Sequence, residues 1–247
     1  MTDAPTPTAT SPSPQWKMIY LARRNPTLAA QDFPQAWREH SALGRGCRNV
    51  ADKVLGVMQC SRVRDAADEQ GGMPGASPDY DGVNLLRLRD LSVATDIWDD
   101  PETQAIMRPD EPRVFSTYVR EFSLVCAEHV QRDAPPTGVV VFGFLRRLPS
   151  VSPAAFRSAW TIESATAWLD APALHSARRI VHNLVVQPPP VGYEFNGIAE
   201  WWFDDVHAAR AAFASGGVAQ QLPKAYGAIA DLDHSVFMFT QVTHQRP

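Results

Sequence analysis

The chain of 247 residues has few cysteines, no dense run of basic residues and no long apolar run. Its three cysteines, Cys47, Cys60 and Cys126, show no Cys-x-x-Cys spacing, which argues against a disulfide framework and favours a reducing, cytoplasmic compartment. The formal net charge is −4, so neither a nucleic acid nor an anionic membrane surface is expected as a partner. Since no apolar run approaches the length of a membrane span, no membrane association is expected.

Several chemical signatures are also missing. The sequence has no Gly-rich phosphate loop and no Gly-x-Ser-x-Gly nucleophile elbow. Its seven histidines show no His-Glu-x-x-His or comparable spacing, so no metal site is predicted. These absences argue against the common nucleotide, serine-hydrolase and metallohydrolase sites, and we expect no cofactor.

What the sequence does contain is an internal repeat. Residues 21–40 read LARRNPTLAAQDFPQAWREH, and residues 144–163, which stand 123 positions later, read FLRRLPSVSPAAFRSAWTIE. Both stretches carry Arg-Arg-x-Pro and then Phe and Trp four residues apart. From about residue 82 the offset becomes 115, which places an insertion in a turn-rich loop of the first copy. A repeat of this kind governs the fold of the whole chain.

Each copy is predicted to form strands and helices in the order βαββαβ. Apolar runs predict strands at 16–22, 54–63, 80–88 and 118–129, and again at 139–145, 178–186, 195–203 and 234–244. One helix should follow the first strand of each copy, and others should span roughly 90–108 and 205–227. Ser152 followed by Pro153 predicts a helix N-cap with proline in the first turn.

This order is the split βαβ, ferredoxin-like unit, in which helices cover one face of a four-stranded sheet. The runs VVVFGFL and SVFMF are apolar on both strand faces, so the second face of each sheet must also be buried. We therefore expect an α+β fold of two tandem ferredoxin-like βαββαβ domains, residues 16–131 and 137–245, whose sheets pack as one barrel with helices outside. Residues 1–15 are rich in Pro, Thr and Ser and are predicted to be a disordered tail.

These motifs resemble those of the EthD family in the dimeric α/β barrel superfamily. The resemblance rests on Arg-Arg-x-Pro after the first strand, on Phe-x-x-x-Trp in the next helix, and on the aromatic-Asn/Asp-Gly opening of the third strand. It implies an intramolecular dimeric α/β barrel, because most members are single domains that dimerise, and it leaves open a homodimer of such pseudo-dimers. It also implies a ligand between one sheet and its two helices. The superfamily includes lactone isomerases, polyketide cyclases, cofactor-free monooxygenases and haem peroxidases.

Four polar residues are the candidate catalytic groups. His40 shares a helix face with Trp37, which directs it toward the interior, and EthD members often carry a histidine near this place. Glu163 takes the equivalent place in the second copy, His182 lies in the middle of an apolar strand, and His175 precedes that strand. A couple of Glu163 with His182 or His175 is a candidate acid/base pair. Structural alternatives stay open: His40 beside a helix C-terminus, Glu163 turned to water, and His182 hydrogen-bonded inside the barrel.

Aromatic side chains are denser in the second copy than in the first. Side chains suited to an apolar ring ligand are Trp160, Trp201, Trp202, Phe195 and Asn183 in the second copy, and Tyr80 and Trp37 in the first. Core filling is the commoner role of a tryptophan, and this alternative also stays open. On the density of aromatic and histidine residues, we expect the second copy to hold the working site.

The sequence favours a cofactor-independent acid/base enzyme of the isomerase, dehydratase, cyclase or lyase type. Its expected substrate, and the only expected partner besides a second copy, is a small, largely apolar ring compound such as an intermediate of aromatic catabolism or polyketide synthesis. One alternative is a non-catalytic small-molecule-binding accessory protein of a catabolic pathway. Another is a haem- or oxygen-using member of the superfamily.

Overall fold

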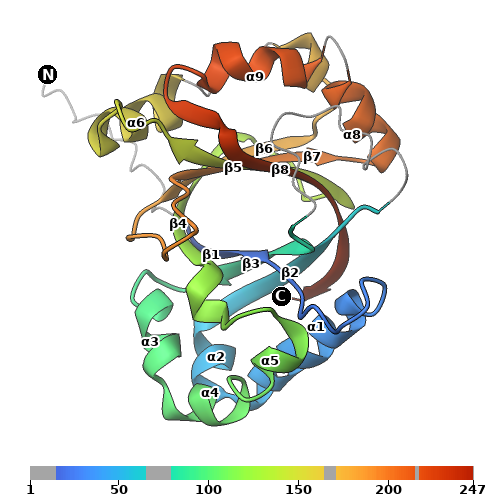
Figure 1. Ribbon diagram of the computed structural model, residues 1–247, viewed down its shortest axis with the longest axis vertical. Coiled ribbons are helices and arrows are strands. Elements are labelled where there is room, and N and C mark those ends of the chain that lie inside the picture. Colours follow the sequence, from blue (N-terminus) through green and yellow to red (C-terminus); the bar gives the residue numbers. More distant parts are fainter. Residues whose placement is uncertain (1–14, 65–78, 164–170, 215–216, 247) are drawn as a thin grey trace, which may run out of the picture.

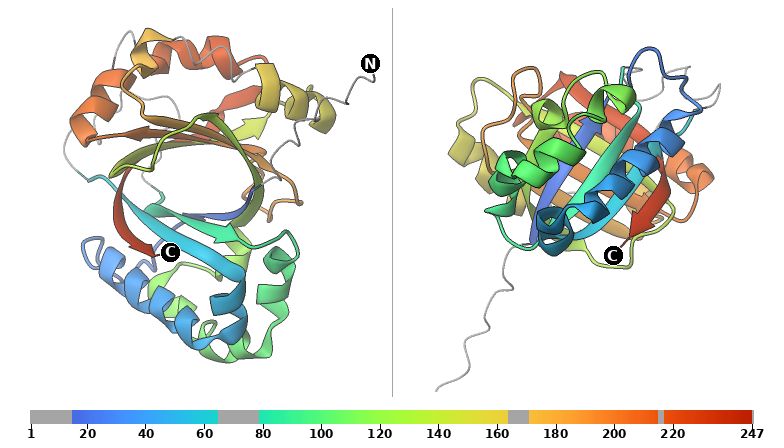
Figure 2. Two further views of the ribbon diagram at one scale, coloured as in Figure 1. Left: turned by 180° about the vertical axis from the view of Figure 1, so that it is seen from behind. Right: turned by 90° about the horizontal axis from the view of Figure 1, so that it is seen from below.

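The computed structural model describes residues 15–64, 79–163, 171–214 and 217–246, with the backbone alone described at 162, 163 and 219. Eight antiparallel strands close into one barrel, and helices cover it on two opposite sides (Figure 1). Figure 2 shows the same two helical layers from behind. The predicted α+β barrel with helices outside is confirmed. Of the predicted disordered tail, Gln15 instead begins a strand, and the remaining residues lie outside the described ranges.

The first half of the chain, residues 15–132, holds four of the strands. They are β1 (Gln15–Ala22), β2 (Val54–Arg62), β3 (Gly82–Leu88) and β4 (Ser123–Arg132). Its helices and helical turns are α1 (Phe33–Leu43), η1 (Gly44–Gly46), α2 (Arg48–Lys53), α3 (Val93–Asp99), α4 (Pro101–Ile106), α5 (Glu111–Val114) and η2 (Val119–Phe122). The helix expected over 90–108 is thus interrupted at Asp100, whose carboxylate caps α4 by accepting the Thr103 N–H at 2.8 Å.

The second half, residues 139–246, holds the other four strands. They are β5 (Val139–Arg147), β6 (Arg179–Val185), β7 (Gly197–Phe203) and β8 (Ala230–Arg246). Its helical elements are α6 (Pro153–Ser158), the π-helical turn η3 (Ala159–Glu163), η4 (Pro172–Leu174), α8 (Val206–Phe213) and α9 (Val218–Tyr226). Ser152 caps α6 as predicted, since its hydroxyl accepts the Ala155 N–H at 3.1 Å. All eight predicted strands are present and differ from the prediction only at their ends.

The strand order around the barrel is β1-β3-β2-β8-β5-β7-β6-β4. Within each half the order is therefore the same, with the fourth strand followed by the first, third and second. The halves join at two seams, where β2 pairs with β8 and β4 pairs with β6. Backbone hydrogen bonds at these seams close the barrel, so the inward faces of both sheets share one interior.

A tryptophan–glycine contact recurs in both halves. A Cβ atom on Gly82 would lie 2.8 Å from the ring of Trp37, and one on Gly197 would lie 2.7 Å from the ring of Trp160. Each third strand therefore needs glycine where the helix tryptophan packs on it. The contact fixes how the first helix of each half sits on its sheet, and in the first half it positions the candidate site.

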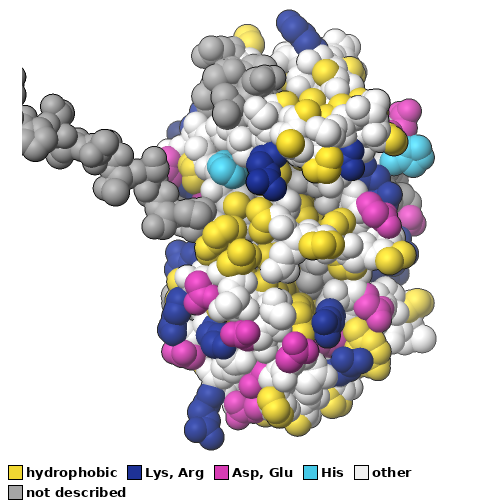
Figure 3. All heavy atoms as spheres, turned by 90° about the vertical axis from the view of Figure 1, so that its left-hand side faces the viewer, with side chains coloured by type: hydrophobic (Ala, Val, Ile, Leu, Met, Phe, Trp, Pro, Cys, Tyr) yellow, Lys and Arg dark blue, Asp and Glu magenta, His cyan; other side chains and the backbone are white. Residues whose placement is uncertain are grey.

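The hydrophobic core has three parts, one under each helical layer and one inside the barrel. The barrel interior is apolar around Leu21, Phe142 and Phe144 and becomes polar near Lys17 and Glu200. Among the described residues, no helix combines the length and apolar character needed to cross a membrane. On the side of the molecule shown in Figure 3, acidic and basic side chains are interspersed.

Candidate functional site

A small cavity lies between the first-half sheet and its helices and has a volume of about 60 Å³. His40 and Trp37 from α1 line it on the helical side, and Tyr20, Gln59 and Asn84 from three strands line it on the sheet side. These positions follow from local pattern. Trp37 and His40 are three residues apart and share the buried face of α1, while alternate strand residues face the helices.

His40 is buried, and its Nδ1 lies 3.0 Å from Oδ2 of Asp110. Arg113 donates through Nε to the other carboxylate oxygen at 2.7 Å, and the hydrogen bonds of Arg113 and His40 hold the pKa of Asp110 below its usual range. Because an ionised carboxylate only accepts, Nδ1 of His40 carries the hydrogen. Burial lowers the pKa of His40 more than Asp110 raises it, so the ring is neutral at neutral pH and Nε2 is its basic nitrogen.

A row of polar side chains crosses the first-half sheet under the helices. Asn84 is the cross-strand partner of Tyr20 on one side and of Gln59 on the other. Gln59 donates through Nε2 to the Trp37 carbonyl at 3.2 Å. Within the described part of the chain, however, Oε1 of Gln59 and Oδ1 of Asn84 have no hydrogen-bond partner. A buried acceptor without a donor costs free energy. These two oxygens can therefore accept hydrogen bonds from a ligand that enters the cavity.

Two further groups at this cavity have shifted pKa values. Burial raises the pKa of the Tyr20 phenol far above its usual value, so the phenol stays protonated and can donate. Burial also raises the pKa of Glu111, although its Oε2 accepts the Val119 N–H at 2.9 Å. The cavity therefore combines a neutral base with a protonated donor.

The equivalent layer of the second half is filled by rings. At the repeat offsets, His182 stands in the place of Gln59 and Tyr226 in the place of Glu111. His182 is fully buried, with Nδ1 3.1 Å from the Trp160 carbonyl oxygen and Nε2 3.1 Å from the Tyr226 hydroxyl. Burial lowers the pKa of His182 to about 4, and its ring stacks on Trp160 with centroids 4.3 Å apart. Proton transfer by His182 would require one of these hydrogen bonds to break.

The other acidic and basic residues predicted for the second half are not brought to His182 by any described contact. Only the backbone of Glu163 is described, at the end of η3, so the prediction for its side chain lies outside the described residues. His175 is exposed just after η4. The couple of Glu163 with His182 or His175 therefore stays a prediction.

The predicted aromatic lining of the second half is divided between two faces of the sheet. Trp160 and Trp201 belong to the outer layer under the helices, where Trp201 packs on Phe213 with centroids 5.5 Å apart. Trp202 and Phe195 face the barrel interior. Adjacent strand residues point to opposite faces, so Trp201 and Trp202 cannot line the same pocket, and of these four side chains Trp160 and Trp201 share the layer under the helices.

The remaining predicted binding residues lie in three different places. Asn183 faces the barrel interior and donates through Nδ2 to Glu200 at 2.8 Å. Tyr80 lies among the apolar side chains of the interior, with its ring centroid 6.2 Å from that of Tyr193. Trp37 forms part of the wall of the cavity beside His40.

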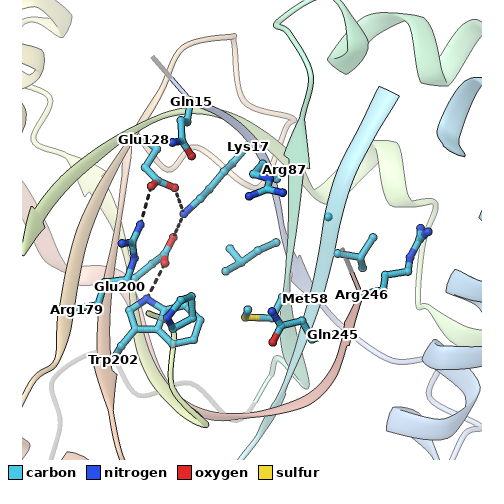
Figure 4. Close-up of a pocket in the computed structure, with 14 residues that line it drawn as sticks. Gln15, Lys17, Met58, Arg87, Glu128, Arg179, Glu200, Trp202, Gln245 and Arg246 are labelled. Atoms are coloured by element: carbon cyan, nitrogen blue, oxygen red, sulfur yellow. Dashed lines mark hydrogen bonds and ion pairs between the residues drawn. The ribbon is translucent and has the colours of Figure 1, made fainter. Parts of the chain in front are cut away.

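A larger cavity of about 330 Å³ lies at one end of the barrel (Figure 4). There Lys17 Nζ lies 2.5 Å from Glu128 and 2.7 Å from Glu200, and Arg179 donates to Glu128 at 2.8 Å. Burial disfavours the charge on Lys17 and on Glu200, but their mutual attraction outweighs it, raising the pKa of Lys17 and lowering that of Glu200. These groups are ionised at neutral pH and are not prepared for proton transfer.

The sequence analysis missed this ionic cluster and also missed Asp110. The only signal for the cluster was an isolated charge inside an apolar strand, Lys17 in WKMIYLA and Glu200 in GIAEWWF. No group of three or more His, Cys, Asp or Glu side chains within the described ranges is placed to hold a metal ion. Burial raises the pKa of the Cys60 and Cys126 thiols, so neither is a thiolate nucleophile.

Part of the sequence matches a known protein family. Residues 25–117, which include His40 and Asp110, match the family model described as the EthD domain. Among curated proteins, none matches this sequence.

Solved structures resemble the chain over nearly its whole length. An anthrone oxidase-like protein is 12% identical, with 95% of this chain and 94% of that chain covered and a TM-score of 0.61. A proposed monooxygenase of Fusobacterium nucleatum subsp. nucleatum is 9% identical, with 96% and 95% covered and a TM-score of 0.55. A proposed chlorite dismutase is 11% identical, with 94% and 96% covered and a TM-score of 0.50. At these identities the likeness establishes the shared dimeric α/β barrel fold.

Proposed function

We propose, on the premise that the chain belongs to the EthD family through residues 25–117, that it is an enzyme whose His40–Asp110 pair moves a proton in the first-half cavity. One observation carries the proposal. A buried, neutral histidine, held by a carboxylate, lines a cavity whose sheet side presents two amide oxygens without described partners. The reaction class is proton transfer at a carbon next to a carbonyl, as in isomerisation, dehydration, cyclisation or lyase steps.

The roles of the side chains follow from their protonation states. His40 Nε2 takes the proton from carbon, and the electron pair of the broken C–H bond moves to the carbonyl oxygen. Asp110 keeps the Nδ1 hydrogen bond and stabilises the imidazolium that forms. The protonated Tyr20 hydroxyl, which is hydrogen-bonded with Ser123 in the structure, turns from that partner and donates to the developing enolate oxygen. Return of the proton from His40 to a different carbon completes an isomerisation.

The size of the cavity limits what can enter. Its 60 Å³ is well below the cavity of about 150 Å³ that takes a benzene molecule. Only the reacting end of a ring compound therefore enters, unless the half-buried Met107 moves, as its flexible thioether allows. Arg246 also borders this cavity, has a buried Nε without a partner in the described chain, and points away from the barrel interior (Figure 4). Its charge would hold an anionic substituent at the edge.

The two halves are, in this proposal, tandem ferredoxin-like units with the bounds 16–131 and 137–245. The shared strand order and the recurring tryptophan–glycine contact support the duplication. The first unit holds the cavity of the proposed kind, and the second supplies the other side of the barrel. A homodimer of the whole chain stays a prediction.

The residues beside His40 do not fit a haem. His40 Nε2 is the ring nitrogen that would ligate iron, but the cavity of about 60 Å³ is far smaller than a porphyrin. A haem-using reaction at this position is therefore not proposed. Addition of hemin should give no Soret shift that depends on His40.

The test is deuterium incorporation from D₂O into a panel of cyclic ketones, enones and lactones, followed by mass spectrometry. Wild-type protein should accelerate exchange for at least one member, and His40→Gln should lower that rate by about 100-fold or more. The rate should rise with pH through the pKa of His40, which lies below the usual 6.5, because only the neutral ring accepts a proton. His175→Gln is the matched control, since His175 is exposed and outside the cavity. Full activity in His40→Gln would contradict the proposal.

A further inference from the structure

The cavity at the end of the barrel, which the proposed reaction does not use, carries a second inference. We propose that it binds a small carboxylate with an apolar, ring-sized body. Its volume of about 330 Å³ falls within the range of about 300–1,000 Å³ typical of small-molecule sites. Apolar side chains, including Met58, Leu85 and Trp202, form part of its wall.

The acceptors in this cavity are already satisfied. Every oxygen of the carboxylates of Glu128 and Glu200 accepts at least one hydrogen bond or ion pair. The donors to these two carboxylates are Lys17, Arg179, Asn183 and Trp202. The cavity therefore has no unused carboxylate oxygen to offer a cationic ligand.

The donors, in contrast, are in surplus. An ammonium group has three N–H donors, and Lys17 uses two of them on Glu128 and Glu200. A guanidinium has five, and Arg87 has one hydrogen bond, from Nη2 to the Leu55 carbonyl at 3.1 Å. Nowhere in the described ranges does Arg87 have a carboxylate partner. Lys17 and Arg87 therefore have N–H donors left over, and these donors suit a negatively charged acceptor.

Lys17 and Arg87 are also placed to share one anion. They are direct cross-strand partners in the pairing of β1 with β3, and both line the cavity (Figure 4). Like charges directly opposite each other destabilise a sheet, and an anion between them removes that cost. A carboxylate at this point leaves the body of the ligand against Met58, Leu85 and Trp202.

This site is separate from the His40 cavity. Successive residues of β2 point to opposite faces, so Met58 faces the barrel interior while Gln59 faces the helices. The two cavities therefore lie on opposite sides of the sheet, although Val57 and Arg246 border both of them. Binding in the barrel can fail or succeed independently of proton transfer at His40.

The experiment is calorimetric titration of the full chain with 1-naphthoate and with 1-naphthalenemethanol, which has the same rings without the charge. We expect wild-type protein to bind naphthoate about tenfold or more tightly than the alcohol, because hydrogen bonds to a charged acceptor are stronger than those to a neutral one. Arg87→Gln should remove that difference by weakening naphthoate alone. Arg87 is exposed, so the variant should fold. Gln245 is exposed and lines the cavity. Gln245→Trp should therefore fill part of the cavity and weaken the binding of both compounds.

Two controls locate the binding. Arg120→Gln removes an exposed arginine that does not line the cavity and has only a 3.8 Å contact to Asp99, and it should change neither affinity. His40→Gln should leave naphthoate binding unchanged. No binding by wild-type protein, equal binding by Arg87→Gln, or loss of binding in His40→Gln would each overturn the inference.

Discussion

The two helical layers cover opposite sides of one barrel and both contain clustered aromatic rings, but the first also holds a cavity lined in part by polar side chains. Tyr20 in β1 corresponds to Gly143 in β5 at the repeat offset. A Cβ on Gly143 would lie 2.8 Å from Phe237 and 3.1 Å from Trp201, so aromatic rings occupy the space that a side chain would need. On the proposed duplication, one layer became optimised for packing while the other kept buried polar groups that cost stability.

The same difference appears in hydrogen bonding. In the first layer, Gln59 and Asn84 each keep a buried oxygen without a described partner. In the second, both ring nitrogens of His182 are satisfied by Trp160 and Tyr226. Two buried oxygens without a described partner in one layer, against a fully hydrogen-bonded histidine in the other, are expected when the first site binds a ligand and the second histidine supports the fold.

The largest loss of stability should come from removing either of the equivalent tryptophans. Trp160→Ala should lower the free energy of unfolding by about 4 kcal/mol, because Trp160 is fully buried and stacks on the rings of Phe156 and His182. Trp37→Ala should cost about 1 kcal/mol less, since Trp37 already borders a cavity. Denaturant titration of both variants measures the two costs. A larger cost for Trp37→Ala would contradict the contrast in packing.

The next effect is a dependence of stability on pH. His182 has a pKa of about 4 in the folded chain and about 6.5 when unfolded, so the unfolded state binds the proton first as the pH falls. Between pH 7 and pH 5 this should cost the wild-type protein about 2 kcal/mol, and the loss should level off below pH 4. His182→Gln, which introduces the residue found at position 59, should lack this part of the loss. The free energy of unfolding is measured for both proteins at each pH. If it falls with pH by the same amount in both, His182 does not titrate as described.

The smallest effect should be a gain in stability within the first layer. Asn84→Leu removes a buried oxygen without a described partner and adds apolar surface at the cavity, so it should stabilise the fold by about 1 kcal/mol. The same change should lower exchange activity, because it removes a polar group of the proposed site. The equivalent change in the second layer, Ala199→Leu, should destabilise, since Ala199 is fully buried. Thermal unfolding of the two variants provides the comparison.

Much of the fold could be predicted because the same sequence motifs occur in both halves of the chain and form the same contacts. Arg24 and Arg147 come from the same motif, and their backbone N–H groups donate to Asp81 and Asn196, both at 2.9 Å. Those acceptors stand directly before Gly82 and Gly197, the glycines of the third-strand motif. Local sequence therefore encoded both the strand ends and their contacts. The break between α3 and α4 was missed although the sequence signals it, since Asp100 followed by Pro101 is an N-cap with proline in the first turn.

Less of the site could be predicted, because it depends on contacts between distant segments. His40 was found from its helical spacing to Trp37, but Asp110 lies 70 residues away and its approach depends on how α5 packs on α1. The barrel cluster joins Lys17, Glu128 and Glu200, three residues from three different strands. The expectation that the second half is the working site rested on its number of aromatic and histidine residues, which does not show which face of the sheet each ring occupies.

The most direct test of the central claim is a pH titration of ¹⁵N-labelled histidine side chains by NMR, assigned with His40→Gln and His182→Gln. The account predicts that His40 is the Nδ1–H tautomer with an unprotonated Nε2, and that it gains a proton reversibly at a pH below 6.5. His182 should stay neutral until about pH 4. An Nε2–H tautomer at His40, or a His182 that titrates near neutrality while His40 does not, would contradict the assignment of the proton-transfer site to the first half.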